Sequence, residues 1–492
     1  MSESVEIMPD ATLLARLRQH AEHRPDAIAY RLRSAGALTY RQLADQAAAL
    51  ADWLMERIPR GSTVILSCPG DLHYPGAFLG ILTAGCAVFP VSPEASDVEL
   101  LRAASESEAV CIVGDERSIR LLTESGRMLS RHTHEESPRT NSPDDALRRL
   151  ERSSGDLLLQ SSGTTGLPKI ARRTGDSLDS VARATAEAIG FTMNDRVLMT
   201  IPLAHSYGLE HGLLAPIWAG SCVHLCPGLD LQILLPELAD GITIFPGVPS
   251  TFEMLAGLHG EASMMPMLRS AYSAGAPLPQ SVFETFLAKY NVRITQLYGA
   301  TEIGSVAFNS PADPFDSASV GRAMRGVSIR IVDLVGHGGL LSAGNEGQIA
   351  IHAPSMFSGY LNGSSDLIDG HFLTGDLGRL DESGCLFVTG RLKLLIDVGG
   401  MKVNPLEVEA VLQQHPAVAA CVVIAVRQTA TINRLKAIIE PRDSSHPPSI
   451  ETLRQLARDH LSAYKVPRFF EICSDLQRSS NGKIRRHLLE LK

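Results

Sequence analysis

The amino-acid sequence predicts an α/β fold with a small α+β domain at its carboxyl end. Short apolar runs of strand character alternate with amphipathic helical segments through most of the 492 residues. This alternation favours largely parallel sheets covered by helices. At about 150 residues per domain, the length suggests about three folding units.

The first part of the chain carries the clearest alternation. Helices are expected over Tyr40–Met55, where apolar residues recur at helical spacing, and over Leu178–Ala188. The uncharged run Leu72–Pro93 could cross a membrane by length alone, but prolines and glycines interrupt it. A helix of about ten residues ending at Gly85, followed by a strand, fits this run better. Strands are expected at Thr63–Ser67, Cys86–Val91, Ala109–Val113, Arg196–Ile201, Cys222–Leu225 and Ile242–Phe245.

The pattern changes toward the carboxyl end. The polar segment Ser130–Asp144 contains two prolines and is expected to be an exposed loop. Short strands and glycine turns follow beyond about residue 340, as in Gly347–Ile351 and Gly384–Thr389. The boundary of the last domain is expected near Gly390–Lys393. Its elements are predicted in the order strand, helix, strand, helix, over Pro405–Gln414, Ala419–Val426, Leu435–Glu440 and Ile450–Leu461.

Composition and charge narrow the function classes. The chain is 44% hydrophobic and 20% charged, which is typical of a folded globular protein rather than a disordered one. Its net charge of −9 argues against general electrostatic binding of nucleic acid. Local pockets that bind small anions are compatible with this charge. The first ten residues lack the apolar core of a signal peptide, so a cytoplasmic protein is expected. The pair Cys222 and Cys226 lacks the spacing of a zinc site and reads as part of a strand.

The strongest local signal is a loop of small residues after an apolar strand. The run Leu157–Gln160 leads into Ser-Ser-Gly-Thr-Thr-Gly-Leu-Pro-Lys, which ends at Lys169. Glycines let backbone N–H groups wrap around an anion, hydroxyls add donors, and the lysine adds charge. A Walker loop is excluded because Pro168 precedes the lysine and Ile170 follows it. The segment therefore predicts a phosphate cradle, with a plain surface loop as the alternative.

This loop resembles the phosphate loop of the acyl-adenylate-forming superfamily, which includes acyl- and aryl-CoA synthetases, adenylation domains of non-ribosomal peptide synthetases, and luciferases. Further motifs of the superfamily follow in its order, and the CoA ligase branch is the nearest. The similarity runs from about residue 38 to 488. The motifs are Gln296–Glu302, Leu373–Asp376, Gly390–Lys393, Gly399–Glu409 and Asn481–Lys483, with weaker markers at Leu38–Tyr40, Ser273–Pro277 and Gly359–Leu361.

The resemblance implies a fold and a division of the chain. It implies a large N-terminal adenylate-forming domain, residues 1–392, built from two α/β subdomains and a distorted β-barrel. A small mobile α+β lid domain, residues 393–492, would carry the terminal lysine. In the family this lid rotates between the two half-reactions, about a hinge that corresponds to Lys393.

The resemblance also implies roles for residues that would bind ATP and Mg²⁺. In the family, the threonine and glutamate of the second motif contact the α-phosphate and bind Mg²⁺, which carries over to Thr301 and Glu302. A hard cation prefers such oxygen ligands and offsets charge on departing pyrophosphate. Asp376 would accept the ribose hydroxyls, with Arg391 as a second ribose contact. The remaining expected ATP contacts are Ser161, Ser162, Gly163, Thr164, Thr165, Gly166, Lys169, Gly275, Ala276, Pro277, Tyr298 and Gly299.

Two further residues are assigned by resemblance. Lys483 matches the lysine that bridges the acyl carboxylate and the phosphate during adenylation, where a cation between two approaching anions is the expected device. His205 matches the histidine that lines the acyl pocket of CoA ligases. Amino-acid-activating relatives usually carry an aspartate in this segment, and none lies between Ile201 and Gly228. Because an unpaired buried ammonium is costly, an acid without an α-amine is expected.

Three positions depart from the family pattern. Ile170 stands where glycine often follows the loop lysine, and Gln348 stands where glutamate is usual. Asp397 occupies a place where many relatives have lysine. This last change makes the thioester-forming step less certain than adenylation.

Together these observations predict an ATP-dependent acid–thiol ligase that uses Mg²⁺ and passes an aryl or medium-chain acyl group to a phosphopantetheine thiol, expected to be coenzyme A. The alternative is a free-standing adenylation enzyme that loads an acyl carrier protein. A non-catalytic acyl- or nucleotide-binding protein would be expected to have lost Lys483, Glu302 or Asp376, and all three are present. No nucleic-acid partner and no membrane span are expected, and a homodimer is left open.

Overall fold

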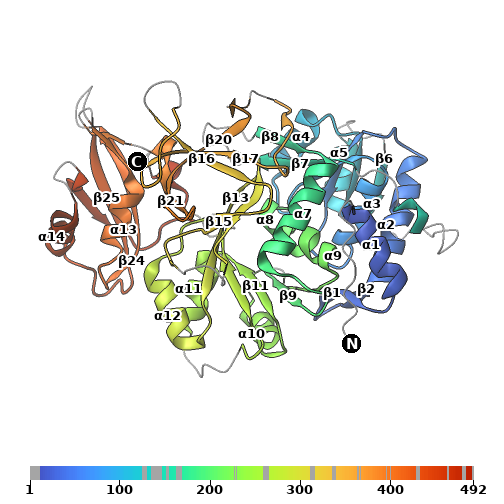
Figure 1. Ribbon diagram of the computed structural model, residues 1–492, viewed down its shortest axis with the longest axis horizontal. Coiled ribbons are helices and arrows are strands. Elements are labelled where there is room, and N and C mark those ends of the chain that lie inside the picture. The colour runs from blue at the N-terminus through green and yellow to red at the C-terminus, as the bar shows by residue number, and fades with distance from the viewer. Residues whose placement is uncertain are drawn as a thin grey trace.

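The molecule consists of a large N-terminal body and a smaller carboxyl-terminal unit that lies to one side of it (Figure 1). Among the described residues, no helix is both long and apolar enough to span a membrane. The computed structural model describes residues 11–124, 130–133, 147–150, 155–161, 169–226, 228, 230–258, 265–310, 316–334, 339–362, 365, 367–394, 396–398, 401–427, 433–461, 465–478 and 484–489.

A nine-stranded sheet forms one half of the body. Its central strands are parallel, and antiparallel strands flank them at both edges. The strand order is β15 (Arg322–Ala323), β14 (Gly304–Phe308), β13 (Ile294–Ala300), β12 (Ser270–Ser273), β11 (Ile244–Gly247), β9 (Arg196–Met199), β10 (Cys222–Leu225), β1 (Ile28–Leu32) and β2 (Gly36–Thr39).

A seven-stranded sheet forms the other half. It is parallel at its centre, and the antiparallel pair β7–β8 lies toward one edge. The strand order is β18 (Gly359–Tyr360), β8 (Lys169–Arg173), β7 (Leu157–Ser161), β4 (Ala87–Pro90), β3 (Thr63–Ser67), β5 (Cys111–Gly114) and β6 (Ser130–Thr133).

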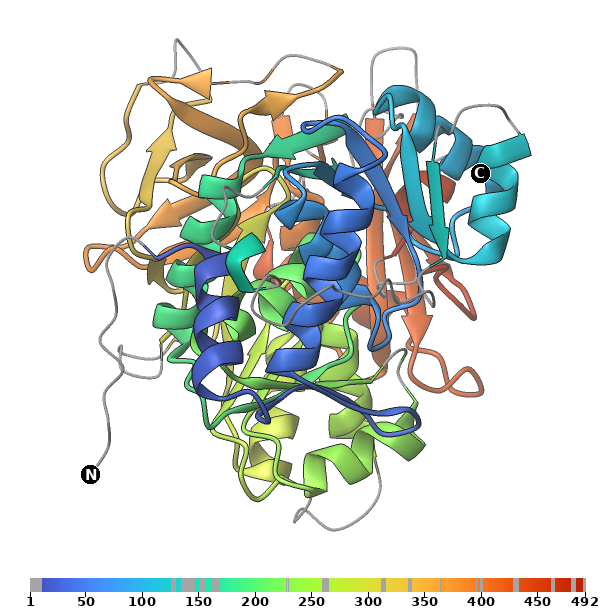
Figure 2. The same cartoon turned by 90° about the vertical axis from the view of Figure 1, so that its right-hand side faces the viewer.

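Helices cover these sheets, and a shared apolar core contains residues from both halves. Helix α2 (Tyr40–Met55) begins at a capping box between Thr39 and Gln42, as its sequence favours. It packs tightly on α3 (Tyr74–Thr83), where a Cβ on Gly80 would lie 2.8 Å from a backbone oxygen of α2. Figure 2 brings α2 and α1 (Leu13–His23) to the front. The other helices of the body are α4 (Asp97–Glu106), α5 (Glu116–Glu124), α7 (Gly175–Ile189), α8 (Ser206–Leu209), the π-helix η1 (Glu210–Leu214), α9 (Ala215–Ala219), α10 (Leu231–Ala239), α11 (Pro249–Gly257) and α12 (Gln280–Tyr290).

A third, antiparallel sheet completes the body in the region where the distorted β-barrel is expected. It has its own apolar core, which also takes in residues of the hairpin β13–β14. Its strands are β16 (Ser328–Val332), β17 (Gly347–His352), β20 (His371–Leu380) and β19 (Leu367–Ile368), with β21 (Leu386–Arg391) paired to β20.

The carboxyl-terminal unit, here called the lid, has separate cores of its own. The 3₁₀ turn η2 (Leu392–Leu394) leads into it. Its elements are β22 (Ile396–Val398), β23 (Met401–Val403), α13 (Pro405–Leu412), β24 (Val418–Arg427), β25 (Asn433–Pro441), α14 (Ile450–His460), β26 (Phe469–Ile472) and the 3₁₀ turn η4 (Arg486–Leu488).

The α/β class with a small second unit is confirmed, but two local predictions are wrong. The four lid segments predicted from the sequence form a helix, two strands and a helix. The first is a helix because Asn404 caps α13 and Pro405 occupies its first turn. The segment beginning at Ser130 is a strand over Ser130–Thr133, since its backbone pairs in parallel with β5 and extends the sheet. His132 is buried there, with its ring 4.9 Å from that of Trp53. The rest of the expected loop lies outside the described residues.

Candidate active site

The predicted phosphate loop connects two antiparallel strands. Ser161, the last residue of β7, is paired with Lys169, the first residue of β8. The connection between them therefore begins and ends at one point on the sheet. The loop residues Ser162, Gly163, Thr164, Thr165 and Gly166 lie outside the described part of the chain.

Lys169 is linked to the candidate magnesium ligand through one tyrosine. Its ammonium lies 4.5 Å from the centre of the Tyr360 ring. The Tyr360 hydroxyl donates a 2.7 Å hydrogen bond to Oε1 of Glu302. Strand β18, which carries Tyr360, pairs with β8 just beyond the lysine. Tyr360 thus places the lysine expected to bind phosphate next to a carboxylate that suits Mg²⁺.

Thr301 and Glu302 occupy the tight turn between β13 and β14, where both are half-buried. The turn requires glycine at its base, because a Cβ on Gly299 would lie 2.5 Å from the backbone oxygen of Gly304. The backbone oxygen of Glu302 also accepts a 2.7 Å hydrogen bond from the N–H of Phe357. The connection from β17 to β18 therefore helps to fix this turn.

The predicted ribose contacts meet at one carboxylate. Tyr298 donates a 2.7 Å hydrogen bond to Oδ2 of Asp376, and Nε of Arg391 lies 3.3 Å from Oδ1. Asp376 and Arg391 face each other across β20 and β21. Burial, together with the nearby charge of Asp376, raises the pKa of Tyr298 well above its usual value. The phenol therefore stays a donor, and it holds the carboxylate in place.

The predicted adenine segment follows the carboxyl end of β12. Gly275, Ala276 and Pro277 are exposed there. Gly275 has a φ of +86°, a conformation that glycine adopts without strain. In open α/β sheets, ligands bind beyond the carboxyl ends of the parallel strands, and this segment lies at such an end.

His205 comes directly before α8, and its neighbour ties that segment to the rest of the body. Ser206 donates a 3.1 Å hydrogen bond to Oε1 of Glu210, the first residue of the π-helix η1. The other oxygen of Glu210 accepts a 2.9 Å hydrogen bond from the N–H of Ser305, three residues beyond Glu302. The candidate acyl segment is thus joined to the magnesium-binding turn.

Two predicted residues of the lid cannot be placed as side chains. Lys393 lies in η2, but its side chain is outside the described residues, and so is the whole of Lys483. Their roles remain predictions from the resemblance. The same holds for the side chain of Asp397, although its backbone belongs to β22.

The residues present fit a magnesium ion that is shared with a nucleotide. Among the described residues, no group of three or more histidine, cysteine, aspartate or glutamate side chains could hold a metal by itself. Glu302 uses Oε1 to accept a hydrogen bond from Tyr360. A carboxylate and phosphate oxygens are the donor set that Mg²⁺ takes in such sites. Glu302 would therefore supply the one protein carboxylate.

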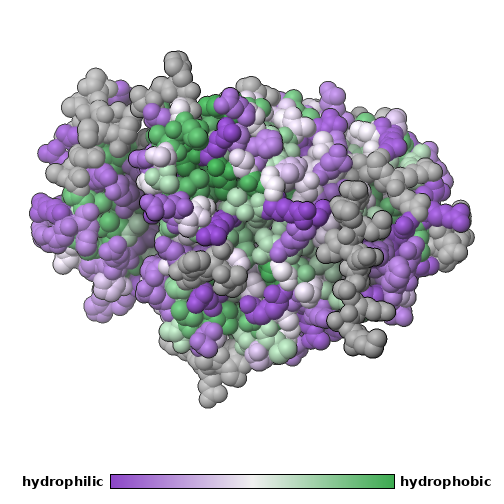
Figure 3. Space-filling model, viewed as in Figure 1, coloured by the Kyte–Doolittle hydropathy of each residue, from purple (hydrophilic) through white to green (hydrophobic). Residues whose placement is uncertain are grey.

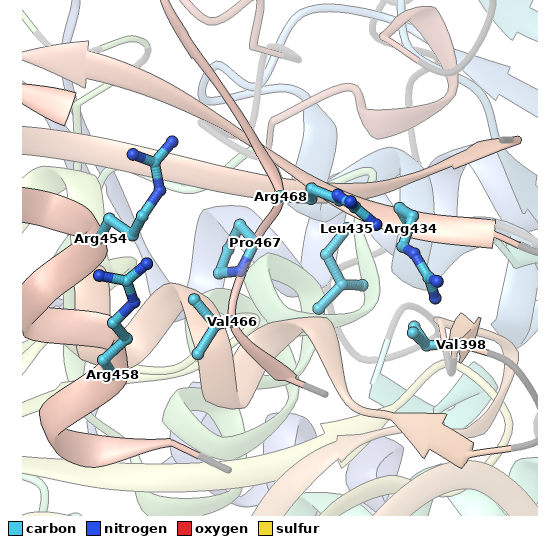
Figure 4. Close-up of a pocket in the computed structure, with 8 residues that line it drawn as sticks. All are labelled: Val398, Arg434, Leu435, Arg454, Arg458, Val466, Pro467 and Arg468. Atoms are coloured by element: carbon cyan, nitrogen blue, oxygen red, sulfur yellow. The ribbon is translucent and has the colours of Figure 1, made fainter. Parts of the chain in front are cut away.

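The lid carries a pocket rich in arginine (Figure 4). Its volume is about 570 Å³, and Val398 of β22 forms part of its wall. Arg454 and Arg458 reach it from α14, and they share the carboxylate of Glu451, with N–O distances of 3.0 and 3.8 Å. In Figure 3, hydrophilic residues gather over this end of the molecule. The lining residues are Val398, Arg434, Leu435, Arg454, Arg458, Val466, Pro467 and Arg468.

Sequence reasoning underrated one residue and missed a cluster. Tyr360 appeared only within a weak marker, and no local spacing indicates that it reaches Glu302, 58 residues away. The buried cluster around Glu210 was not foreseen at all. The available signal was Glu210, which apart from histidines is the one charged-type residue in the run 206–226 of the sequence.

Comparison with protein families gives two matches in this chain. The model of the AMP-binding enzyme family matches residues 17–361. The model of the AMP-binding enzyme C-terminal domain matches residues 407–483. The first match covers the phosphate-loop motif and Gln296–Glu302, and the second covers Asn481–Lys483.

Curated relatives and solved structures agree with these matches. The chain is 27% identical to a malonate–CoA ligase of Arabidopsis thaliana over 479 residues, covering 88% of this chain and 78% of the relative. It is 27% identical to the medium-chain fatty-acid–CoA ligase of Escherichia coli K12, covering 98% and 90%. The structure resembles ATP-bound MatB from Rhodopseudomonas palustris, with a TM-score of 0.87, 24% identity and 98% of each chain covered. It also resembles MenE from Bacillus subtilis, an o-succinylbenzoate CoA synthetase, with a TM-score of 0.82, 23% identity, and 96% and 97% covered.

Proposed function

The chain belongs to the AMP-binding enzyme family, and from this premise we propose that it is an ATP-dependent ligase that joins a carboxylic acid to the thiol of coenzyme A. It would first form an acyl-adenylate and release pyrophosphate. The thiol would then displace AMP. Residues 1–392 would form the adenylating domain and residues 393–492 the mobile lid.

One observation carries the proposal. The turn from Tyr298 to Glu302 is bonded at one end to Asp376 and at the other end to Tyr360, over which Lys169 lies. The expected ribose, magnesium and phosphate contacts are therefore connected through two tyrosine hydroxyls. An arrangement that brings these groups together suits a bound nucleoside triphosphate and its metal ion.

Each group has a defined task in this proposal. Asp376 and Arg391 hold the ribose, and Thr301 contacts the α-phosphate. Glu302 binds Mg²⁺, which offsets the charge that develops as pyrophosphate leaves. Lys169 and the phosphate loop bind the departing phosphates, while Lys483 lies between the acyl carboxylate and the α-phosphate.

The acid is proposed to be an aryl or medium-chain monocarboxylate. The segments expected to line its pocket are His205–Gly208, Val248–Ser250, Ser273–Gly275 and Leu297–Ser305. They contain no lysine, arginine or aspartate, and their one glutamate, Glu302, is assigned to Mg²⁺. An ammonium or a second carboxylate would then lack a counter-charge, and leaving such a charge buried and unpaired is costly. Malonate and oxalate, named in some relatives, are therefore expected to be poor substrates.

The lid pocket favours free coenzyme A over a carrier protein as thiol acceptor. Four arginines line it, and among described residues only Glu451 forms ion pairs with any of them. Such a concave cationic surface suits the phosphates of the nucleotide end of coenzyme A. The wall residue Val398 belongs to the segment that lines the approach of the thiol in the family.

The direct test is pyrophosphate release with ATP and Mg²⁺ across aryl, fatty, amino and dicarboxylic acids, with and without coenzyme A. We expect release with one class of monocarboxylate and stimulation by coenzyme A. Lys483→Ala should abolish adenylation, and turnover that survives this change would contradict the proposed mechanism. Release that coenzyme A leaves unchanged would favour a carrier protein as the acceptor.

A second test addresses the acceptor. Arg454→Gln with Arg458→Gln should raise the KM for coenzyme A while leaving the KM for pantetheine, which lacks the nucleotide, unchanged. Arg18→Gln, in the amino-terminal helix α1 and half-buried there, is the control. An equal effect on both thiols would remove the pocket from the proposal.

A further inference from the structure

A buried cluster centred on Glu210 joins four segments of the candidate active site. Glu210 is 2% exposed and Arg173 is fully buried. The guanidinium Nη1 of Arg173 donates a 2.5 Å hydrogen bond to Oε1 of Glu210. Arg173 ends β8, the strand that begins at the phosphate-loop lysine. The ion pair therefore connects the seven-stranded sheet to η1, a helix of the other half.

The second oxygen of Glu210 is bonded to the strand that follows the magnesium-binding turn. Ser305 donates to Oε2 through its N–H at 2.9 Å and through its hydroxyl at 2.7 Å. With Arg173 and Ser206 on Oε1, the carboxylate accepts four hydrogen bonds. Four bonds fill the acceptor capacity of a carboxylate. Its position is therefore fixed relative to Ser305.

His211 extends the cluster to the adenine segment. Nε2 of His211 lies 3.0 Å from the hydroxyl of Ser305, and Nδ1 lies 2.8 Å from the hydroxyl of Tyr272. Because the Ser305 hydroxyl donates to Glu210, it accepts from Nε2–H, which leaves Nδ1 to accept from Tyr272. Burial lowers the pKa of His211 to about 4, so the ring is neutral near pH 7. Tyr272 belongs to β12, directly before the adenine segment.

The charge of Glu210 is maintained in this interior. Burial alone would raise the pKa of Glu210, but the charge of Arg173 and the hydrogen bonds from Ser305 lower it below its usual value. The ion pair is nevertheless expensive, since Nε and Nη2 of Arg173 have no hydrogen-bond partner among the described residues. A matched pair of apolar side chains is often at least as stable as such a buried ion pair. Its cost is easier to understand if the cluster serves the site.

The local backbone is adapted to this contact. Glu210 opens a π-helix, a feature that is found mostly as an insertion near functional sites. Gly304 has a φ of +71°, and a Cβ there would lie 2.9 Å from Nη2 of Arg173. The strand that follows the magnesium turn thus passes directly against the guanidinium group.

We infer that Glu210 is a positioning residue for adenylation, holding the turn of Thr301 and Glu302 in register with the acyl segment and with β8, whose first residue is the phosphate-loop lysine. The inference rests on the proposed function. Glu210 acts through Ser305 on the turn and through Arg173 on β8. Loss of this link lets the magnesium ligand move relative to the phosphates, and a displacement of about 1 Å can cost about 100-fold in rate.

The test uses Glu210→Gln and Ser305→Ala in the full-length protein. The amide of glutamine would place donors opposite Ser305 or Arg173. We expect acid-dependent ATP–pyrophosphate exchange to fall about 100-fold in Glu210→Gln and about tenfold in Ser305→Ala. The Mg²⁺ concentration for half-maximal exchange should rise in both. Thioester formation from chemically prepared acyl-adenylate should stay within about twofold of the wild type, because it does not need the metal-bound triphosphate.

Thr243→Val is the matched control. It removes one hydroxyl donor from Asp195, another buried carboxylate bonded to an arginine, far from the turn in sequence. At a comparable loss of Tm, it should leave exchange and the Mg²⁺ requirement unchanged. Variants of the Glu210 cluster that behave like this control, or that slow both half-reactions equally, would overturn the inference. If Glu210→Gln does not fold, the same measurements on Ser305→Ala alone decide whether the cluster has a positioning role.

Failure of the proposed function gives a different result. The wild type would then show no acid-dependent exchange with any acid. In that case Mg²⁺–ATP binding, measured by calorimetry on the same variants, tests the inference. Equal affinity and equal Mg²⁺ dependence in Ser305→Ala and the wild type would reject a positioning role.

Discussion

Two clusters, each with a buried carboxylate paired to an arginine, occupy different places on the nine-stranded sheet. In one, Asp195 accepts hydrogen bonds from Arg269, Thr243 and Thr192. Asp195, Thr243 and Arg269 directly precede the strands β9, β11 and β12, respectively. Thr192 precedes the turn that leads into β9. In the other, Glu210 joins Arg173 and Ser305 near the candidate active site. The same chemistry thus occurs at the amino ends of the strands and beside the magnesium turn.

The clusters differ in how fully they are paired. Arg269 uses Nε and Nη2 on Asp195, donates also to the backbone of Gly190, and remains 42% exposed. Arg173 is fully buried and uses a single nitrogen. In the Asp195 cluster, at the end of a sheet, the arginine is well paired and the energetic cost of burial is low. In the Glu210 cluster the arginine is incompletely paired, which costs stability, and the cluster connects separate segments. The difference separates a stabilising cluster from a positioning one.

The largest expected effect comes from removing the buried arginine. Arg173→Leu leaves the carboxylate of Glu210 without its counter-ion in the interior, so the free energy of unfolding should fall by about 3–5 kcal/mol. Chemical denaturation measures this change. Adding Glu210→Met should recover most of the stability, because the charge is then gone. If the recovered double variant also regains full adenylation, the two clusters do not differ in the way described.

Acid should distinguish the clusters next, because only the Glu210 cluster contains a histidine. The pKa of His211 is lowered by burial to about 4 in the folded protein, against about 6.5 when unfolded. Between these values the unfolded chain binds more protons, so stability falls as the pH drops from about 6.5 to 4, by at most about 3 kcal/mol for this residue. His20, whose pKa burial also lowers to about 4, adds to the loss.

The measurement is the free energy of unfolding against pH. His211→Gln should show a shallower decline than the wild type over this window, and its remaining decline should include the share of His20. Thr192→Ala, in the Asp195 cluster, should lose some stability at every pH with the wild-type slope. An unchanged slope in His211→Gln would contradict the buried, neutral histidine.

The smallest effect is expected from the exposed arginine. Arg269→Leu should cost about 1–2 kcal/mol, because Asp195 keeps its hydrogen bonds to Thr192 and Thr243 and water can reach the vacated space. Thermal and chemical denaturation test this value. Pyrophosphate exchange per folded molecule should be unchanged, and a loss of adenylation here would show that both clusters serve the site.

Local features of the fold followed from the sequence. Helix α2 spans Tyr40–Met55 as predicted, because capping residues and apolar spacing act over a few neighbours. Strand β10 likewise has its predicted bounds. The lid order was misjudged at Pro405, where a capping asparagine and a proline at the first turn mark a helix start. The sequence therefore contained a local signal for this helix.

The order of the motifs also came from the sequence, and with it the family and the cofactor class. The roles of Asp376 and Glu302 stay predictions from the same motifs. These follow from short runs of residues whose chemistry is evident without a fold.

Only the tertiary structure decided which distant side chains meet. Tyr360 reaches Glu302 across 58 residues, Tyr298 reaches Asp376 across 78, and Glu210 reaches Ser305 across 95. Such contacts depend on strand register and on how two sheets pack around η1. Neither the register nor the packing can be predicted from the spacing of neighbouring residues. The sequence of a strand specifies which of its faces is buried but not which partner covers that face.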